Sequence, residues 1–418
     1  MANNNNKDKC NVPHLRFPEF SEEWEICKVS ELLDFYSTNS LSWEQLEYGT
    51  KAIMNLHYGL IHVGLPTMVD LTRDNLPNIK EDNMPKNFEL CKEGDVAFAD
   101  ASEDTNEVAK TVEFFNLAGK DIVCGLHTIH GRDNKNRTVI GYKGYAFSST
   151  AFHNQIRRIA QGTKIYSISS KNFSECYIGL PSKPEQTKIA TLLRLIDERI
   201  VTQNKIIEKL QSLIKGLNDN IHKGIKGETV CFSDLGEAYS GLSGKGGDDF
   251  GYGEPFITYM NVYQNTYISE KDYELVQIAP NEKQNSVQYG DALFTLSSET
   301  PEEVGIGAVY LGNTQKLYLN SFCFGIHFYD ERVLPQYLAH FISSSSFRRA
   351  IYPLAQGSTR FNLQKNDFMK MKFLLPSLEK QGHIANTLDA LHCRLANEKS
   401  LTEQYILLKK YLLSLMFI

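Results

Sequence analysis

The chain has 418 residues, a formal net charge of −6, 42% apolar residues and 11% aromatic residues. This length and apolar content are sufficient for two or three domains with ordinary hydrophobic cores. The negative net charge argues against indiscriminate nucleic-acid binding, although a sum over the whole chain hides local patches. The first residues lack an apolar signal core and no run of about 18 apolar residues occurs, so we expect a cytoplasmic protein.

The eight cysteines are scattered, with no CxxC motif and no Cys/His spacing typical of a metal site. Free thiols in a reducing compartment are therefore expected, and no metal site is predicted. The cysteines are Cys10, Cys27, Cys91, Cys124, Cys176, Cys231, Cys323 and Cys393.

The chain begins with an N-terminal arm, residues 1–22, whose Phe17 and Phe20 should pack onto the first domain because aromatic side chains are costly to leave in water. The domain itself is expected over residues 23–183. It mixes short β-rich runs with short helical stretches, which predicts an α+β fold. The β-rich runs are Asp95 to Phe98, Thr138 to Phe147 and Ile165 to Ile168, and the clearest helix is Thr150 to Ala160.

A long helix is predicted next, in residues 184–226, ending near Gly224 and Gly227. Its apolar positions alternate steps of four and three, the a/d seam of a coiled coil, interrupted by Gln203. A helix of this length would reach about 55–60 Å. The predicted seam is Ile189, Leu193, Ile196, Ile200, Ile207, Leu210, Ile214 and Leu217.

A second globular domain, residues 227–378, precedes a second long helix, residues 379–418. The seam of the second helix starts at Ile384, Leu388, Leu391 and Leu395, each 195 residues after its counterpart, with Glu398 where the first helix has Gln203. It then slips and continues through Leu401, Tyr405, Leu408, Leu412 and Leu415. We expect the helices to pair as an antiparallel coiled coil; the alternative is that each packs on a separate core.

Short matches in a constant order show that the chain is a tandem duplication. The pairs are Ser30 to Leu32 with Ser233 to Leu235, Met54 to Leu56 with Met260 to Val262, Gly94-Asp95 with Gly290-Asp291, AQGT from Ala160 with AQGS from Ala355, and LPSKPEQ from Leu180 with LPSLEKQ from Leu375. The domain interiors diverge, which indicates one scaffold carrying two different readers. Antiparallel helices would relate the halves by a pseudo-twofold axis and place the domains at opposite ends, so that the molecule could measure distance.

Each half carries a basic window. No Asp or Glu occurs from Gly141 to Ser174, nor from Arg332 to Asn366. Two such windows on a mildly acidic chain suggest two surfaces that face a polyanion, although each could be only a solvated face. The phosphate-contact candidates are Arg157, Arg158 and Lys164 in the first domain and Arg348, Arg349 and Arg360 in the second.

Base reading needs hydrogen-bonding side chains on projecting loops. Candidates are Ser102, Glu103, His127 and Arg132 in the first domain and Ser297, Ser298, Glu299 and Asn320 in the second. Gln161 and Gln356 each precede a glycine turn that could bring backbone N–H groups to a phosphate. The alternatives are that Gln-Gly-Ser/Thr only caps an element and that His127 is a core histidine. The glycine-rich segment Tyr239 to Glu254 is either a groove-facing loop or a plain surface loop.

Motifs of catalysis are missing from the sequence. It has no GxxxxGK[ST] phosphate loop, no HExxH motif, no GxGxxG followed by an acidic residue and no Asn/Asp-Pro-Pro-aromatic tetrapeptide. We therefore expect a non-catalytic chain without a cofactor of its own.

The ordered motifs closely resemble the specificity subunit of type I restriction-modification systems over nearly the full length. They are VPHLRFPEF near the N-terminus, GDVAFADASED and GDALFTLSSETPEE, AQGT and AQGS, and LPSKPEQTKIA with LPSLEKQGHIA, each followed by a long helix. The resemblance implies two target recognition domains that each read one half of a bipartite, asymmetric double-stranded DNA target, with the helices setting the spacer.

The same resemblance implies partners: two methyltransferase subunits and two restriction/translocase subunits. These would hold S-adenosylmethionine, ATP and magnesium. Two rival functions stay open at this point. One is a stand-alone nuclease that uses carboxylates such as Asp95 and Asp291; the other is a protein-interaction scaffold.

Overall fold

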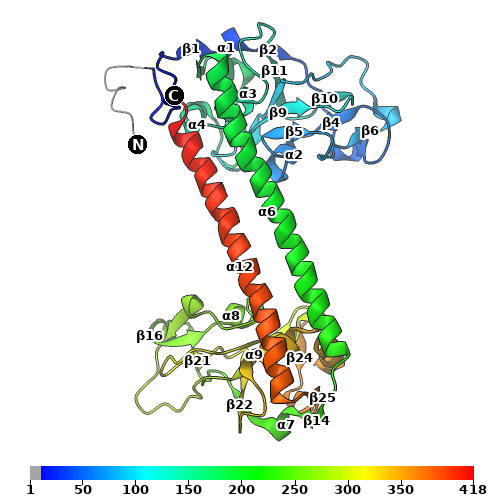
Figure 1. The fold of residues 1–418 in the computed structure, drawn as a ribbon, viewed down its shortest axis with the longest axis vertical. Helices are drawn as coiled ribbons and strands as arrows, with labels where there is room; N and C mark the ends of the chain where they lie inside the picture. Colours follow the sequence, from blue (N-terminus) through cyan, green and yellow to red (C-terminus); the bar gives the residue numbers. More distant parts are fainter. Residues whose placement is uncertain (1–10) are drawn as a thin grey trace. The chain divides into compact units, whose positions relative to one another are not determined.

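The computed structural model describes residues 11–418 (Figure 1). Cys10 and residues 1–10 of the expected N-terminal arm lie outside the described residues. The chain divides into two compact units. The first takes the residues up to Asn204 together with Ser400–Ile418, and the second takes Lys205–Lys399. Each unit contains an α+β domain, which is the fold class that the sequence predicts, and each unit also contains part of both long helices.

The first domain has a five-stranded sheet in the order β2-β11-β7-β9-β5 and a four-stranded sheet in the order β10-β4-β6-β3. Their strands are β2 Asp34–Tyr36, β3 Leu46–Glu47, β4 Met54–Leu56, β5 Met68–Asp70, β6 Asn78–Ile79, β7 Val96–Ala99, β9 Thr111–Asn116, β10 Ile122–Cys124 and β11 Thr128–Arg132. The helices are α1 Val29–Leu32, α2 Tyr58–Val63, α3 Tyr142–Phe147, α4 Thr150–Ile159 and α5 Ser170–Ser174. Aromatic rings from the sheet and three helices fill the core: Phe98, Phe147, Phe152 and Phe173.

The second domain has a four-stranded sheet in the order β15-β22-β18-β20 and a three-stranded sheet in the order β17-β16-β21. Their strands are β15 Gly236–Ser240, β16 Phe250–Ile257, β17 Tyr273–Val276, β18 Ala292–Thr295, β20 Gly307–Val309, β21 Tyr318–Leu319 and β22 Cys323–Phe328. The helices are α7 Phe232–Leu235, α8 Tyr259–Gln264, α9 Pro335–Ser343, α10 Ser345–Ile351 and α11 Lys365–Met369. The helices and most of the strands follow the same order as in the first domain, although each of the two sheets has one strand fewer.

Equivalent positions make equivalent backbone contacts in the two domains. Gly94 donates its N–H to the carbonyl of Phe114, and Gly290 donates to that of Tyr310. One expected match is wrong, however. Met54–Leu56 is strand β4, whereas Met260 lies in α8. The counterpart of β4 is the end of β16, because each strand runs directly into the residue that caps the following short helix, His57 or Thr258.

The β-rich run predicted from Thr138 to Phe147 is also wrong, because Tyr142–Phe147 forms helix α3 and no strand precedes it in this segment. Its aromatic residues favour a strand locally, but a tertiary contact decides otherwise. The buried carboxylate of Glu113 accepts hydrogen bonds from the N–H groups of Gly141 (2.9 Å) and Gly144 (2.7 Å) at the start of the helix. Lys143 Nζ lies 3.2 Å from the same carboxylate. An anion at a helix N-terminus stabilises the helix.

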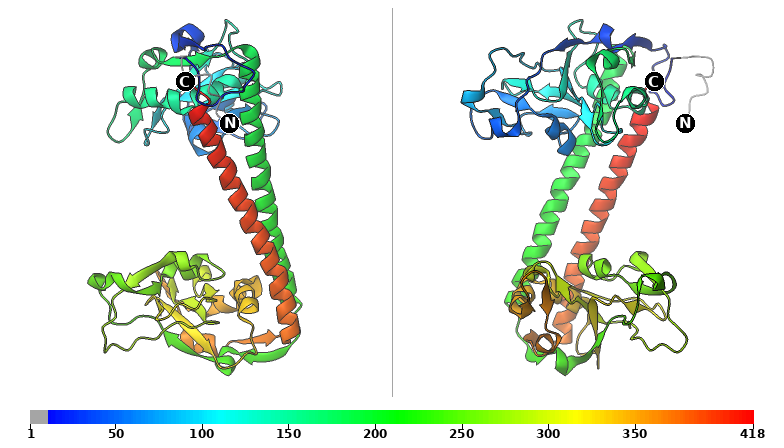
Figure 2. Two further views of the ribbon diagram at one scale, coloured as in Figure 1. Left: turned by 60° about the vertical axis from the view of Figure 1, so that its left-hand side comes forward. Right: turned by 180° about the vertical axis from the view of Figure 1, so that it is seen from behind.

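The long helices are α6, Lys183–Lys223, and α12, Leu378–Leu415. They lie side by side in antiparallel directions within each unit (Figures 1 and 2). In the first unit, Lys409 Nζ lies 2.6 Å from Asp197 Oδ1, and the Arg199 side chain bonds the Tyr405 hydroxyl. In the second unit, both helices line one cavity of about 470 Å³, to which Ile214 and other residues contribute.

Most of the predicted seam is withdrawn from solvent. Buried members are Ile189, Leu193, Ile196, Ile214, Leu388, Leu395 and Leu412, and partly buried members are Ile200, Ile207, Leu210, Leu217, Ile384, Leu391 and Tyr405. The first three also belong to the core of the first domain, so pairing and packing on a domain core coexist.

The predicted slip after Leu395 does not occur. Leu408 is 43% exposed, whereas Glu398 and Thr402 are buried. The positions withdrawn from solvent continue at steps of three and four, through the buried Glu398 and Thr402 and the partly buried Tyr405 and Lys409 to the buried Leu412. Because polar residues occupy several of these inner positions, a search for apolar residues alone does not detect the regular period.

A glutamine fixes each domain to the start of its helix. Gln186 accepts from the N–H of Val139 and donates to the carbonyls of Arg137 and Pro181. Gln381 makes the same three bonds, with Leu334, Arg332 and Pro376. These contacts explain why LPSKPEQ and LPSLEKQ are alike.

The N-terminal segment adds a contact that only the first copy has. Arg16 binds Glu185 of α6 through two hydrogen bonds of 2.7 and 2.8 Å. Next along the chain, strand β1, Glu25–Lys28, pairs with β13, Tyr177–Leu180. The second domain has the equivalent pair, β14, Glu228–Cys231, with β25, Lys372–Leu375. The segment LRFPEF thus attaches to the start of the helix.

Candidate nucleic-acid interface

A small strand ladder gathers several candidate residues of the first domain. Strand β12, Tyr166–Ser167, pairs with β8, Ala101–Ser102, on one side. On the other side, Ser167 exchanges two backbone hydrogen bonds with Gln161. The AQGT turn therefore becomes a hairpin, residues 161–167, that lies directly beside Ser102 and Glu103. We call this segment the QG hairpin.

The second domain repeats this ladder. Strand β24, Phe361–Leu363, lies between β23, Ala355–Gln356, and β19, Ser297–Ser298. Its QG hairpin is residues 356–362. Glu299 follows β19 directly, so each domain places a QG hairpin beside a serine and a glutamate.

Glycine is required at the second residue of each QG hairpin. Gly162 and Gly357 have φ angles of +144° and +147°. A Cβ at these positions would lie 1.9 Å from the carbonyl oxygen of Ile165 and 2.0 Å from that of Arg360. The motif is therefore a specific turn and not a simple cap. Its tips, residues 162–165 and 357–360, are exposed to solvent.

An exposed ring flanks each ladder at the same position. The carbonyl of His127 accepts from the N–H of Asp100, and the carbonyl of Phe322 accepts from that of Leu296. Phe322 is 55% exposed, and the Arg360 guanidinium lies 5.8 Å from its ring centre. His127 is exposed too, with φ +55°, so it is not a core histidine. The N–H of Phe322 is held by the side chain of Asn320, which is half-buried.

Four of the basic candidates project freely. Arg158, Lys164, Arg349 and Arg360 are exposed, and none forms an ion pair with another residue between 11 and 418. Arg157 is exposed as well, and its guanidinium donates to the neutral amides of Asn106 and Asn154. Its positive charge is thus not balanced by either partner, as a phosphate contact requires.

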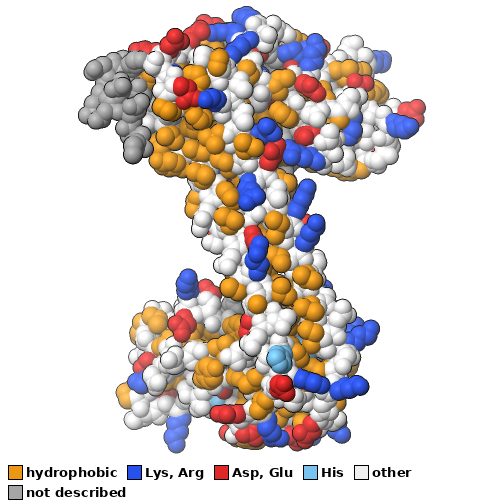
Figure 3. Space-filling model, viewed as in Figure 1, with side chains coloured by type: hydrophobic (Ala, Val, Ile, Leu, Met, Phe, Trp, Pro, Cys, Tyr) orange, Lys and Arg blue, Asp and Glu red, His pale blue; other side chains and the backbone are white. Residues whose placement is uncertain are grey.

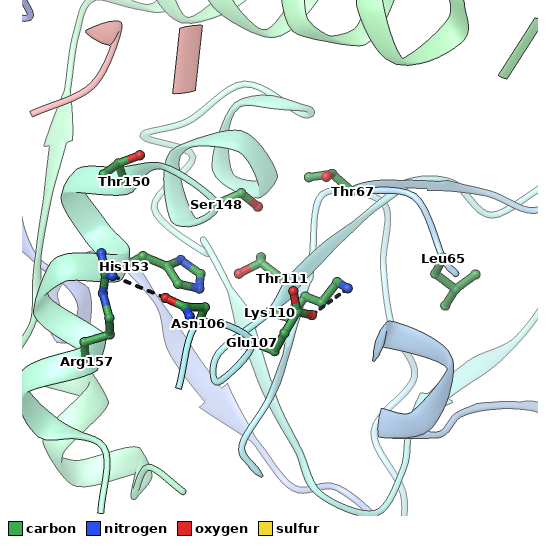
Figure 4. A pocket seen from close by; sticks show the side chains of 10 residues that line it. All are labelled: Leu65, Thr67, Asn106, Glu107, Lys110, Thr111, Ser148, Thr150, His153 and Arg157. Atoms are coloured by element: carbon green, nitrogen blue, oxygen red, sulfur yellow. Dashed lines mark hydrogen bonds and ion pairs between the residues drawn. The ribbon is translucent and has the colours of Figure 1, made fainter. Parts of the chain in front are cut away.

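An open pocket of about 300 Å³ lies beside Arg157 (Figure 4). The figure shows the Arg157 side chain reaching Asn106, and Lys110 paired with Glu107 between Asn106 and Leu65. Glu107 compensates the Lys110 charge, since Lys110 Nζ lies 2.7 Å from Glu107 Oε2. Burial lowers the pKa of His153, which disfavours a positive charge on its ring. Within this pocket Arg157 is therefore the group best placed to attract an anion.

Other candidates are occupied by internal contacts. Arg132 is 7% exposed, bonds Asp95 and Glu89, and donates to the carbonyl of Leu90. Ser297 and Ser298 are buried, and the Ser298 hydroxyl donates to Glu303. These side chains are therefore engaged in contacts inside their domains and are not free to contact bases.

Arg348 has a structural position, unlike its neighbour Arg349. Its guanidinium donates to the backbone carbonyls of Glu302, Val304 and Gly305, at 2.6 to 2.7 Å. These bonds fix the loop that follows Glu299. In the glycine-rich segment, Lys245 lies 2.6 Å from Glu282, so its charge is compensated.

The two carboxylates proposed for a nuclease are unsuited to that role. Asp95 and Asp291 are 1% and 2% exposed. Asp95 accepts from His130 and Arg132, and Asp291 from Tyr239 and His327. Burial alone would raise the pKa of Asp95, but the bonds from His130 and Arg132 outweigh burial and hold it below its usual value. Both groups are tied into the fold and do not face solvent.

Sequence reasoning missed the exposed aromatic residues near the interface. Phe322 is one; another is Trp43, 45% exposed, whose ring centre lies 4.5 Å from that of His57. Aromatic side chains in a sequence are normally assigned to the core. Only the near-equal spacing of His127 and Phe322 from the two GD motifs, 33 residues after Gly94 and 32 after Gly290, could have indicated that the two rings are equivalent.

Comparison with known proteins gives a consistent answer. The family model "Type I restriction modification DNA specificity domain" matches residues 74–212 and again 227–404. The specificity subunit of the type I restriction enzyme EcoKI from Escherichia coli (strain K12) is 23% identical over 279 residues, which is 60% of this chain and 58% of that relative. The putative type I restriction enzyme MjaX specificity subunit from Methanocaldococcus jannaschii is 23% identical over 97% of this chain and 95% of its own.

Solved structures share the fold. The S subunit of a type I restriction-modification system from M. genitalium superposes with a TM-score of 0.54 at 13% identity, covering 97% of this chain and 99% of that one. A chain from a structure that describes complex assembly and conformational transition of the type I R-M system superposes with a TM-score of 0.59 at 14% identity, covering 93% of this chain and 96% of that one. The repeated family match, and not the fold alone, assigns the chain. It belongs to the type I restriction-modification DNA specificity family and is a specificity subunit, a class of non-catalytic chain.

Proposed function

We propose that each domain reads one half of a bipartite, asymmetric sequence in double-stranded DNA through its QG hairpin and the flanking ring. The observation that carries the proposal is that one ladder recurs in both domains with different side chains. The first domain presents His127 and Lys164, and the second presents Phe322 and Arg360. A shared frame with different tips is what two different half-sites require.

Phosphate contacts come from the exposed cations in this proposal. Arg157 and Arg158 occupy the last turn of α4, and Arg349 the last turn of α10. Ser102, Glu103, Gln161, Glu299, Gln356 and Asn320 remain candidates for base or backbone contacts beside them. Since the charges are local, the overall charge of −6 does not oppose DNA binding.

The long helices set the spacer between half-sites in this proposal. The exchangeable recognition domains are residues 23–183 and 227–378, and the helices are residues 184–226 and 379–418. Lengthening both helices by whole turns should change the spacer and leave both half-sites unaltered. If a half-site changed instead, the helices would have another role.

The helices also anchor the partners in this proposal. Apolar side chains are exposed along them (Figure 3), among them Leu407, 63% exposed, Tyr411, 57% exposed, and Leu195, 53% exposed. Such side chains are typical of a surface that another protein covers. We assign two methyltransferase subunits to the chain and two restriction/translocase subunits to the complex, with S-adenosylmethionine, ATP and magnesium held by these partners. A cytoplasmic location follows from this role; separately, no helix within residues 11–418 is long and apolar enough to span a membrane.

Salt dependence tests this function against the rivals. Affinity of the reconstituted methyltransferase complex for its target should fall steeply with salt, by a slope of about −0.9 per phosphate contact in a log-log plot. A complex that forms but never binds DNA at low salt would support a protein scaffold. DNA cleavage by the purified chain with magnesium would support the nuclease, which the buried positions of Asp95 and Asp291 disfavour.

A further inference from the structure

Three potential metal ligands meet in the interior of the first domain, although they are far apart in the sequence. Cys124 ends strand β10, Cys91 lies beside that strand next to the Leu90–Val123 bridge, and His130 is on β11. The two Sγ atoms are 3.6 Å apart. One ligand atom from each residue lies within 4.8 Å of the others, and the side chains are 5%, 1% and 0% exposed.

The histidine is oriented as in many metal centres. His130 Nε2 lies 2.8 Å from Asp95 Oδ2, and Asp95 is itself held by Arg132. The other ring nitrogen, Nδ1, is buried and has no hydrogen-bond partner among residues 11–418. A carboxylate on one imidazole nitrogen fixes the ring and raises the basicity of the other nitrogen, the arrangement that metal-binding histidines usually show. A buried nitrogen without a partner is otherwise costly.

The second domain provides an internal comparison. Cys91 donates its N–H to Ile122, and Val287 makes the equivalent bond to Leu317. The same comparison of backbone contacts places Leu319 at the position of Cys124 and Gly325 at that of His130. The fold therefore does not need these side chains. All three ligands are present together in one copy and all are replaced by Val, Leu and Gly in the other.

We propose that Cys91, Cys124 and His130 bind a zinc ion that links the four-stranded sheet to the five-stranded sheet of the first domain. Zinc–sulfur bonds of about 2.3 Å in a tetrahedron place two sulfurs about 3.8 Å apart, close to the 3.6 Å observed. Two thiolates and Zn²⁺ form an electrically neutral group, which suits a buried position. Cu(I) with the same ligands would leave a buried negative charge, and such burial is unfavourable. The fourth position would take water.

The cysteine spacing gave no indication of this site, because the three ligands are brought together by strand pairing. The site goes beyond DNA reading and does not depend on it. A direct test is elemental analysis of the purified full chain, prepared without chelators. About one zinc per chain is expected, lost in Cys91→Val and Cys124→Leu, which install the residues of the second domain. Cys393→Ser, which removes an exposed thiol, should keep the metal.

A second measurement uses the unaltered chain, so it does not rely on the folding of variants. After removal of metal and addition of Co²⁺, thiolate-to-cobalt absorption in the near ultraviolet should appear and disappear again when zinc is added. Mass spectrometry of alkylated chain should show Cys91 and Cys124 as reduced thiols. Metal-free chain with no cobalt absorption would overturn the proposal, as would copper in place of zinc or a Cys91–Cys124 disulfide.

Discussion

At the scale of single residues, hydrogen bonding decides which basic side chains are available for the proposed contacts with DNA. Arg348 and Arg349 are adjacent and identical in type, yet one holds three backbone carbonyls and the other is exposed. Arg132 was expected to read bases, but its contacts lie inside the domain. The basic windows can be located from the sequence. Which of their arginines and lysines are exposed cannot be predicted from it, because burial depends on contacts between segments that are distant in the chain.

The arginine pair gives a matched prediction. Arg348→Ala should destabilise the second domain by about 1–3 kcal/mol, because three carbonyls lose their donor, and the midpoint of urea unfolding should fall. Arg349→Ala should leave that midpoint unchanged and make the log-log salt slope of DNA binding shallower by about 0.9. Equal effects of the two substitutions on stability would contradict the assignment.

At the scale of elements, the sequence predicts those that carry a long period or a repeated motif. The sequence predicts both long helices, the seam of α6 and the turn motifs AQGT and AQGS, but it predicts the seam of α12 only as far as Leu395. Residues 138–147 were misassigned, since the buried Glu113 carboxylate that starts α3 lies some distance away in the chain. The match of Met54 with Met260 is wrong because the Met-Asn identity is a coincidence of two residues. The equivalent positions are the helix caps His57 and Thr258, which differ in residue type.

The QG hairpin yields a prediction for recognition. Gly162→Ala should distort the hairpin, because the added Cβ meets the Ile165 carbonyl at 1.9 Å. Methylation of the target by the reconstituted complex should fall about tenfold, within the 1–3 kcal/mol that base contacts supply. The control, Gly246→Ala, adds a Cβ in nearly open space and should have no effect. An unchanged rate for Gly162→Ala would show that this hairpin does not meet DNA.

The helix junction yields a prediction for stability. Gln186→Ala removes all three hydrogen bonds that attach the first domain to α6, and leaves buried partners unsatisfied. Unfolding should become easier by about 1–3 kcal/mol, measured by urea denaturation. Thr187→Ala, at an exposed neighbouring position, is the control. Comparable losses in the two variants would mean that the glutamine is not the attachment.

At the scale of the whole molecule, duplication supplies one frame and divergence supplies two surfaces. The order of most elements and the glutamine junction repeat, whereas the type of exposed ring, the side chains of the hairpin tip and the cluster around His130 differ. Sequence comparison of the halves finds the frame readily, because its motifs are local. The same comparison detects the exposed rings and the hairpin tips poorly, because their residue types differ and their equivalence is visible only in the pairing of the backbone.

Partner binding can be tested on α12. Leu407→Glu with Tyr411→Glu places charges on two exposed apolar positions, and the methyltransferase subunits should bind at least about tenfold more weakly, since burying a charge is costly. Binding can be followed by analytical ultracentrifugation. Glu379→Lys, at an exposed position near the other end of α12, should have little effect. Normal assembly of the double variant would place the partner surface elsewhere.

The most direct measurement is methylome sequencing of cells that express this chain with its methyltransferase subunit. It would be repeated with a chain in which residues 23–183 come from a relative of different specificity. The account predicts a new bipartite motif with adenine methylated on opposite strands in its two halves, and a change in one half only after the exchange. An assembled complex that produces no motif, or an exchange that alters both halves, would contradict it.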